Sequence, residues 1–233
     1  MIKFEIQPVA ECSLIVYFGS RIDPKLAPFI GEAAKCIAGR FSDQVMNVTP
    51  SYTSILIDYL PFRIHQEQFI TQLRSLLNEQ SQAFTIESKS TLHKLPVYYG
   101  GDTGPDLKAV AEFAGMTSDN VIKLHTESFF RVCAIGFSPG FAFLAEVPNE
   151  IAKPRHDTPR VFVPSGSVGI ASNQTAVYPS RSPGGWNIIG NCPTPLWDSK
   201  NPDSTPDINI GDVVQFYSIT EKEFVSLGGE QWV

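Results

Sequence analysis

Two Ser-Pro-Gly elements, residues 138–140 and 182–184, are the features of this sequence best suited to binding a ligand. Aromatic side chains border both, with Phe137 and Phe141 around the first and Trp186 after the second. Glycine lets the backbone approach a ligand closely, and proline holds the flanking backbone in place. Either element alone is most simply an ordinary β-turn packed on core aromatics. Their occurrence together in one stretch favours a concave binding surface.

Polar side chains between the two elements are candidates for holding an anion or a small polar ring. Arg160 precedes a predicted strand, where its guanidinium could bind a carboxylate or phosphate, or form a salt bridge that fixes the preceding loop. Ser165 and Ser167 lie in a glycine-containing segment that could form an anion nest of backbone N–H groups or a tight turn. Gln174 and Tyr178 are four residues apart on a predicted strand and share a face, where Gln174 could instead satisfy buried backbone. The candidates for binding substrate or phosphate are Phe137, Pro139, Gly140, Phe141, Arg160, Ser165, Ser167, Gln174, Tyr178, Ser182, Gly184, Gly185 and Trp186.

Acid–base chemistry has a single candidate, His125. It is expected at a helix end, where a cation interacts favourably with the helix dipole, so capping competes with an acid–base role. Asp102 and Asp106 flank a Gly-Pro pair and are expected to cap the following helix rather than to act as a general base. The sequence shows no nucleophile–base pair, nucleotide loop or metal-ligand spacing. No partner is evident for the other histidines, His65, His93 and His156.

Length and charge restrict the class of protein. The 233 residues suffice for one large or two small domains with hydrophobic cores. A formal net charge of −6 and the lack of a Lys/Arg cluster argue against binding to nucleic acid or to an anionic membrane. The N-terminal segment has no signal-peptide pattern, and no apolar run is long enough to span a bilayer. A cytoplasmic location is therefore expected.

The first part of the chain, residues 1–89, alternates strand-like and helix-like segments. Asp23 and Pro24 supply a helix start, and Gly39 supplies a helix end. The resulting order predicts a ferredoxin-like α+β domain, in which an antiparallel sheet carries two helices on one face. No catalytic constellation occurs here, so a scaffold or docking role is favoured. Strands are expected at residues 2–7, 12–18, 45–49, 52–60 and 84–88, and helices at about 24–39 and 65–78.

The second part, residues 90–233, begins with two short predicted helices and continues as short apolar runs separated by turns. The helices are expected at 105–114 and 118–125, the second with Ser118 as its N-cap. The spacing of the runs indicates a mainly β domain, a barrel or a sandwich. The polar, proline-rich segment 201–209 is expected to be a surface loop. The apolar runs are residues 131–137, 160–163, 168–171, 175–178, 186–189 and 213–219.

Several motifs in a fixed order resemble the KipI family, also called allophanate hydrolase subunit 1, which includes carboxyltransferase subdomains of the C and D type. The motifs are GFSPGF at 136–141, TPR at 158–160, VPSGSVGIA at 163–171, QT at 174–175 with YP at 178–179, and SPGGWNIIG at 182–190. Looser matches upstream, at 96–101, 104–107 and 124–125, extend the resemblance over nearly the whole chain. Asn191 stands where members often have arginine, which removes a candidate anion contact.

The resemblance implies a cyclophilin-like barrel for the second part and a role as the B subunit of ATP-dependent 5-oxoprolinase, which opens the lactam to glutamate. It implies two partners, a KipA-like protein (allophanate hydrolase subunit 2) and a LamB/YcsF-like protein. ATP is expected to be used by the complex and not necessarily bound by this chain, and no metal site is expected. Other members suggest two alternatives: half of a urea-carboxylase-type carboxyltransferase, and a KipI-type inhibitor that docks on a histidine kinase without catalysis. Prolyl isomerase activity is set aside, because a shared fold does not carry function.

Overall fold

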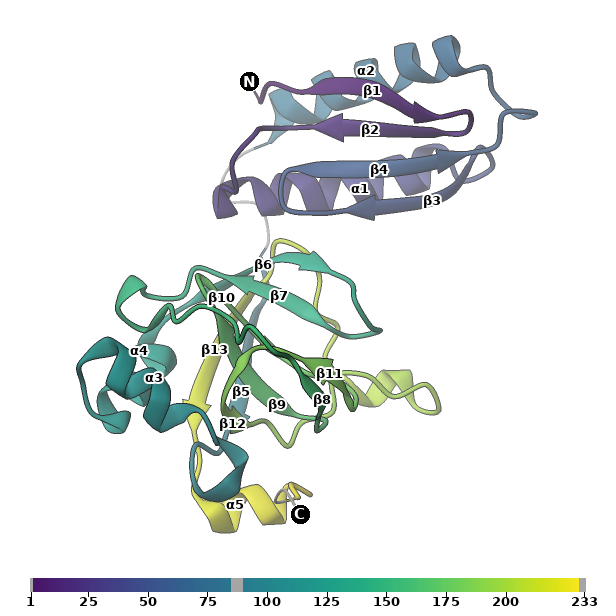
Figure 1. Cartoon of the computed structure of the whole chain (residues 1–233). Helices are drawn as coiled ribbons and strands as arrows, with labels where there is room; N and C mark the ends of the chain where they lie inside the picture. Colours follow the sequence, from purple (N-terminus) through teal and green to yellow (C-terminus); the bar gives the residue numbers. More distant parts are fainter. Residues whose placement is uncertain (1, 85–89, 231–233) are drawn as a thin grey trace. The chain divides into compact units, whose positions relative to one another are not determined.

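The computed structural model describes residues 2–84 and 90–230 (Figure 1). The chain forms two compact units, the first made of Met1–Ser90 with Asn209–Gly211 and the second of Thr91–Ile208 with Asp212–Val233. Residues 85–89, which hold most of the strand predicted at 84–88, lie outside the described residues. The sequence does not predict that Asn209–Gly211 belongs to the first unit. In the described part of the chain no helix is both long and apolar enough to span a membrane.

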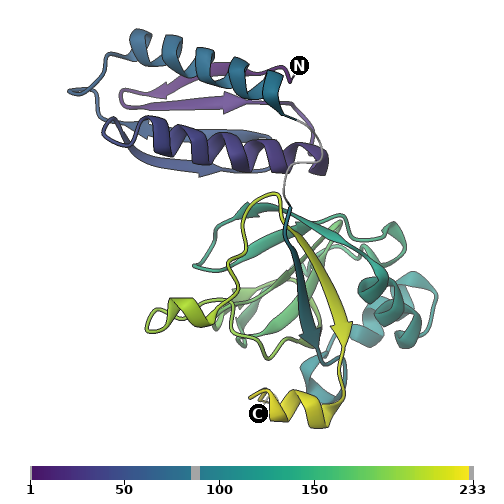
Figure 2. The same ribbon diagram turned by 180° about the vertical axis from the view of Figure 1, so that it is seen from behind.

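In the first unit, four antiparallel strands form a sheet whose one face carries two helices (Figure 2). The strand order is β1-β2-β4-β3. Up to α2, the order of strands and α-helices along the chain is the predicted one. The second helix ends at Ala83 rather than at Asn78, since the polar residues 79–82 continue it without a helix breaker. The elements are β1 (Glu5–Ala10), β2 (Ser13–Tyr17), the 3-10 helix η1 (Pro24–Leu26), α1 (Ala27–Arg40), β3 (Val45–Pro50), β4 (Ser54–Tyr59) and α2 (Gln66–Ala83).

The core of the first unit combines side chains of the sheet with one stripe of each helix. The Asp23 side chain accepts from the Lys25 N–H at 3.0 Å and starts η1 as predicted. Phe29 of α1 packs edge-on against Phe18 at 5.5 Å between ring centroids, and Phe41 does the same against Phe69 of α2 at 5.1 Å. Each such buried side chain contributes about 1.5–3 kcal/mol to folding, so this unit has a hydrophobic core of its own.

The second unit is built on a seven-stranded sheet that is nearly closed into a barrel. The strand order is β12-β9-β10-β7-β6-β13-β5, with β13 and β5 parallel and the other neighbours antiparallel. An isolated bridge between Tyr98 and Asn191, two N–H···O bonds of 2.9 Å, joins the ends of the two edge strands. The strands are β5 (Leu92–Val97), β6 (Phe130–Ile135), β7 (Ala142–Ala145), β9 (Ser167–Ala171), β10 (Gln174–Val177), β12 (Asn187–Asn191) and β13 (Val213–Ser218).

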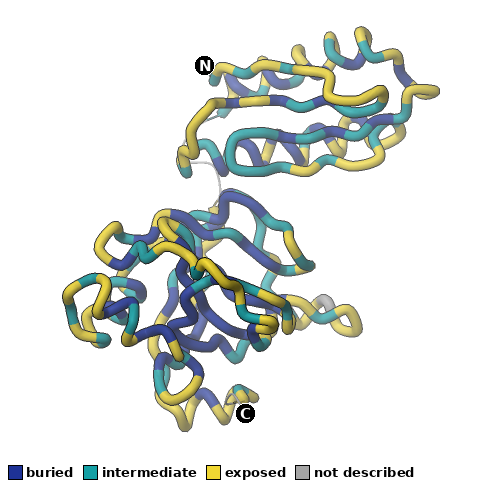
Figure 3. The backbone as a smooth tube through the Cα atoms, viewed as in Figure 1, coloured by how far each residue is buried: buried dark blue, intermediate teal, exposed yellow. Residues whose placement is uncertain are grey.

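Helices and a small two-stranded sheet surround this barrel. Figure 3 shows that its strands are buried along most of their length, whereas the connections between them are exposed. The small sheet pairs β8 with β11. The remaining elements are η2 (Gly101–Thr103), α3 (Leu107–Ala114), α4 (Ser118–Glu127), η3 (Asn149–Ile151), β8 (Arg160–Val163), β11 (Ser182–Gly184), η4 (Pro202–Ser204) and α5 (Glu221–Ser226).

Three strands of the second unit and its last helix have no counterpart in the sequence prediction. β5 carries Pro96, which weakens a strand pattern, and β7 is only four residues long. β11 coincides with the second Ser-Pro-Gly element, which was expected to be a turn. The predicted N-cap of α4 is also wrong by one residue, because Thr117, not Ser118, accepts the capping bond from the Asn120 N–H at 3.3 Å.

Candidate functional site

The glycines that follow the second Ser-Pro element form the floor of a cavity. A Cβ at Gly184 would collide with the Tyr178 hydroxyl group. A Cβ at Gly185 would stand 3.6 Å from Nε of Arg155. Gly184 therefore lets the phenol lie directly against the backbone, and Gly185 stands beside the guanidinium.

Aromatic side chains form the walls of this cavity, which has a volume of about 370 Å³ and is called the aromatic cavity below. The Phe141 ring lies edge-on to Tyr178, with 5.3 Å between centroids, and to Trp186, with 5.8 Å. Phe137 reaches the rim, where its side chain is 65% exposed while its ring remains 5.3 Å from Phe141. Edge-to-face contacts of this kind hold the rings in place. The lining is completed by Phe143, Pro159 and Pro183.

The Tyr178 hydroxyl group stays protonated in this environment. Burial raises the pKa of Tyr178 to about 12, although the Trp186 backbone N–H and the guanidiniums of Arg155 and Arg160 act in the opposite direction. The phenol is therefore neutral near pH 7 and has a proton to donate.

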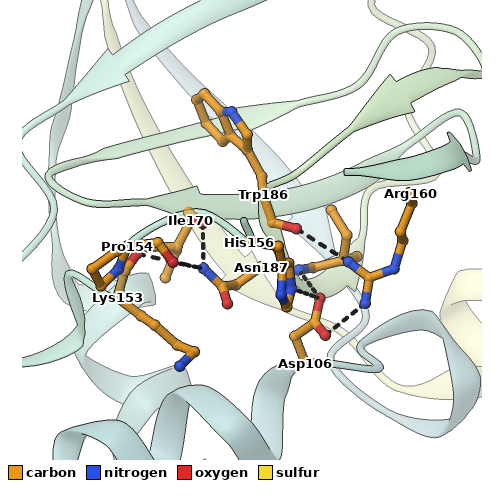
Figure 4. A network of polar contacts seen from close by, with 9 residues as sticks. Asp106, Lys153, Pro154, His156, Arg160, Ile170, Trp186 and Asn187 are labelled. Atoms are coloured by element: carbon orange, nitrogen blue, oxygen red, sulfur yellow. Dashed lines mark hydrogen bonds and ion pairs between the residues drawn. The ribbon is translucent and has the colours of Figure 1, made fainter. Parts of the chain in front are cut away.

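The two arginines near Tyr178 differ in their partners. Arg160 Nη2 donates to Asp106 Oδ1 at 2.6 Å, and Arg160 Nη1 donates to the Trp186 carbonyl at 3.4 Å (Figure 4). No carboxylate of the described residues lies within ion-pair distance of Arg155. Arg160 therefore serves mainly as the salt bridge that was the alternative to anion binding, and Arg155 is the arginine available to a ligand.

The irregular segment that carries Arg155 is held from both sides. Asn187 Nδ2 donates to the Pro154 carbonyl at 2.9 Å (Figure 4). The His156 N–H donates to the Gly185 carbonyl at 2.7 Å. The backbone around Arg155 is therefore fixed by hydrogen bonds to β12 and to Gly185, although Arg155 belongs to neither a helix nor a strand.

Asp106 is the buried centre of the neighbouring polar network (Figure 4). Its carboxylate accepts from the Ile188 backbone N–H as well as from Arg160, both at 2.6 Å. His156 Nε2 lies 3.5 Å from the second carboxylate oxygen, without hydrogen-bond geometry. The expectation that Asp106 caps the next helix is therefore wrong: Asp106 occupies the N-cap position of α3, but its side chain joins that helix to β12 instead.

Two of the histidines for which no partner was expected do have carboxylate partners. His156 faces Asp106, as described, and His93 Nε2 lies 3.0 Å from Asp212 Oδ2. Both carboxylates are distant in sequence, so the pairing depends on the fold. Across the described residues, no group of three or more His, Cys, Asp or Glu side chains is placed to hold a metal ion.

Tyr178 also lines a second cavity, of about 780 Å³, together with Arg160, Ser165 and Arg181. Arg181 lies over the Phe162 ring at 4.0 Å, a cation–π contact. The Ser165 hydroxyl donates to the Pro179 carbonyl at 2.9 Å. Arg160, Ser165 and Arg181 of this larger cavity thus have partners within the protein.

The segment considered as an anion nest is a barrel turn. Gly166 has a φ of 79°, and its N–H donates to the Tyr178 carbonyl at 2.7 Å. The Ser167 N–H donates to the Pro164 carbonyl at 3.3 Å, and Ser167 itself is fully buried. These N–H groups are already bonded to carbonyls, so the tight-turn alternative is the one observed.

His125 is a neutral core residue rather than an exposed helix-end cation. Its Nδ1 accepts from the Tyr99 hydroxyl at 2.7 Å, and its Nε2 donates to the Thr175 hydroxyl at 3.0 Å. Thr175 donates in turn to the Gly169 carbonyl at 2.9 Å, which settles the direction of the chain of hydrogen bonds. Complete burial lowers the pKa of His125 to about 3. This environment leaves no access to a substrate and no proton to exchange near pH 7.

The predicted binding candidates divide between several places in the second unit. Those that meet in the aromatic cavity are Phe137, Phe141, Tyr178, Gly184, Gly185 and Trp186. Arg160 and Ser165 line the larger cavity. Gly140 instead packs against the Leu196–Trp197 backbone, where a Cβ would come within 2.7 Å of the Leu196 carbonyl oxygen. Among the described residues, those candidates that line neither of the two cavities are Pro139, Gly140, Ser167, Gln174 and Ser182.

Sequence reasoning missed Arg155, Asn187 and the structural role of Asp106. The signal for Arg155 is the short basic run from Lys153 to His156, just upstream of the TPR motif. Asn187 lies within the SPGGWNIIG motif, and Asp106 within the Gly-Pro-Asp-Leu match, but neither pattern reveals a bonding partner.

Comparisons with known proteins place this geometry in a family. The B subunit of 5-oxoprolinase from Bacillus subtilis is 31% identical over 96% of this chain and 96% of its own. The protein of the same name from Escherichia coli O157:H7 is 41% identical over 63% of this chain and 65% of its own. A more distant relative, the urea amidolyase of Lachancea kluyveri, is 21% identical over 90% of this chain but only 13% of its own.

Two solved structures are also similar to this chain. A conserved uncharacterized protein of Pyrococcus horikoshii is 35% identical, with a TM-score of 0.55 over 94% of this chain and 100% of its own. TTHA0988 is 28% identical, with a TM-score of 0.78 over 89% of this chain, and this chain spans only 40% of its length. Residues 4–206 match the family described as carboxyltransferase domain, subdomain C and D. This chain therefore belongs to the carboxyltransferase-domain family of subdomains C and D.

Proposed function

We propose that this chain is the B subunit of 5-oxoprolinase, a hydrolase that opens the lactam ring of 5-oxoproline to glutamate with ATP hydrolysis. The observation that carries the proposal is the 31% identity to the B subunit of the Bacillus subtilis enzyme along 96% of both chains. A match of that extent includes residues of both units of this chain. The urea amidolyase relationship is weaker in identity and covers only a small part of a much longer protein.

The aromatic cavity supports a role as one part of a larger site. It offers a guanidinium and a neutral phenol, which can position and polarise a small polar molecule. Among the described residues, its lining contains no serine, cysteine, histidine or carboxylate that could act as nucleophile or general base. This lining is consistent with a site whose water-activating and phosphate-transferring groups are supplied by a partner chain.

The partners that fit this requirement are a KipA-like protein and a LamB/YcsF-like protein. ATP would be used by the complex, and it need not be bound by this chain alone. The fold proposed for residues 1–89 is ferredoxin-like and that for residues 90–233 cyclophilin-like. A complex that consumes ATP and returns glutamate to metabolism is expected in the cytoplasm.

The test is ATP-dependent glutamate formation from 5-oxoproline by this chain with and without the two partners. Turnover only in the full mixture is the expected result. A stable complex without turnover would contradict the assignment of 5-oxoproline as substrate. Absence of any complex, together with inhibition of a histidine kinase by this chain alone, would replace the proposal with the regulatory alternative. Carboxylation of urea by carboxybiotin would replace it with the carboxyltransferase alternative.

A further inference from the structure

We propose that Arg155 binds the carboxylate of the substrate in the aromatic cavity, while the Tyr178 hydroxyl donates to the ring carbonyl. The inference rests on the proposed function for the identity of the substrate, a small cyclic amide that carries a carboxylate. It makes Arg155 the residue that selects acids, a role that the motifs had suggested for Arg160.

The pairing of the two arginines is the first step of the argument. Arg160 is neutralised by Asp106, to which it donates at 2.6 Å, and the Ile188 N–H donates to the other oxygen of the same carboxylate. Arg155 has no carboxylate within 4.0 Å in the described part of the chain. A free guanidinium beside apolar walls pairs strongly with an incoming carboxylate, through two parallel N–H···O bonds.

The glycine floor sets where the two polar groups stand. Gly184 admits the Tyr178 hydroxyl and Gly185 admits the Arg155 guanidinium, so the two groups lie over adjacent residues. In 5-oxoproline the carboxylate-bearing carbon and the carbonyl carbon both flank the ring nitrogen. The Arg155 guanidinium can therefore donate to the carboxylate while the adjacent, protonated Tyr178 hydroxyl donates to the ring carbonyl.

The size and lining of the cavity suit a small ring. Its volume of about 370 Å³ lies at the low end of the roughly 300–1,000 Å³ found for ligand sites. Phe141 and Trp186 present apolar ring surface at right angles to each other, with an interplanar angle of 88°. One wall can cover a face of a five-membered ring while the other closes its edge, and the exposed Arg155 stands where the carboxylate of the ring would lie.

The direct test is binding of 5-oxoproline to the full chain, alone and in the assembled complex, by calorimetry and by tryptophan fluorescence. We expect Arg155→Met to weaken binding about 10- to 100-fold, the effect of losing a charge-assisted hydrogen bond, and Arg155→Lys to weaken it less. Arg181→Met is the matched control, since Arg181 lines the other cavity, and it should bind as the parent chain does. 2-Pyrrolidinone, which lacks the carboxylate, should bind weakly and equally to the parent and Arg155→Met chains.

Three results would overturn the inference: unchanged affinity in Arg155→Met, equal binding of 2-pyrrolidinone and 5-oxoproline, or no saturable binding by chain or complex. The proposed function fails separately. Arg155-dependent binding without ATP-dependent turnover by the complex would preserve the site and reject the 5-oxoprolinase assignment. Turnover of 5-oxoproline with the same KM in the parent chain and in Arg155→Met would support the 5-oxoprolinase assignment and reject the Arg155 site.

Discussion

Replacing Asp106 with alanine would remove the acceptor that joins α3 to β12 and leave two donors unpaired. A hydrogen bond to a charged group contributes roughly 1.5–3 kcal/mol. Arg160 is 29% exposed and regains water when Asp106 is lost, whereas Ile188 is fully buried and its N–H does not. We therefore expect Asp106→Ala to lower the free energy of unfolding of the second unit by about 3 kcal/mol.

Tryptophan fluorescence is the appropriate probe, because Trp186 and Trp197 belong to the second unit and the segments of the first unit contain no tryptophan. With a urea m-value of roughly 2 kcal/mol/M, the unfolding midpoint of Asp106→Ala should fall by about 1.5 M. Asp102→Ala is the matched control, since Asp102 is exposed and precedes the same helix. It should change stability by no more than about 0.5 kcal/mol.

Equal midpoints for Asp106→Ala and Asp102→Ala would refute this reasoning. Such a result would mean that the Asp106 carboxylate does not neutralise Arg160, and Arg160 would return as an anion-binding group. A double-mutant cycle with Asp106→Asn and Arg160→Gln measures the pair directly, and it should show a coupling energy of about 1–3 kcal/mol.

Three further predictions concern the same unit. Burial lowers the pKa of His125 from 6.5 to about 3, so between these values the unfolded chain binds a proton that the folded chain does not. The free energy of unfolding should then fall as pH falls through this window, by up to about 1.4 kcal/mol per pH unit. Urea unfolding at pH 7 and pH 5 should show a smaller pH dependence for His125→Gln, and an unchanged pH dependence would contradict the buried, neutral state. Gly184→Ala should destabilise the unit by about 1–3 kcal/mol through its collision with the Tyr178 hydroxyl, and adding Tyr178→Phe should recover part of that loss; failure to recover would place the strain elsewhere. Ser165→Ala should alter stability by no more than about 1 kcal/mol and leave the KM for 5-oxoproline unchanged, because its hydroxyl bonds the Pro179 carbonyl; a large rise in KM would restore the anion nest.

Local patterns predicted most of the secondary structure correctly. The α1 helix follows from Asp23, Pro24 and a stripe of apolar residues at helical spacing, and β8 occupies the predicted residues 160–163. β5 was missed because it contains a proline, and β7 was missed although it is no shorter than the correctly predicted β8. These two strands form because they pair with β13, β6 and β10, and their own sequences do not show a strand pattern.

In the candidate site, too, some features follow from local sequence and others depend on contacts between distant segments. The SPGGWNIIG and GFSPGF motifs identified the aromatic side chains and the glycines of the cavity, because turns, close backbone approach and ring packing are properties of short segments. The choice between Arg155 and Arg160 was not predictable in this way. It depends on Asp106, which is far from Arg160 in the sequence and reaches it only because α3 packs beside β12.

Residue type and order alone indicate the family, the two-part organisation and the motifs that line the cavity, because these are properties of short segments. The folded structure decides which charges are neutralised and which are free, because ion pairing depends on distances through space. It likewise decided that His125 is neutral, because burial from all sides removes the water that would stabilise its charge. The chemistry of this chain is therefore specified by contacts between segments as much as by the motifs themselves.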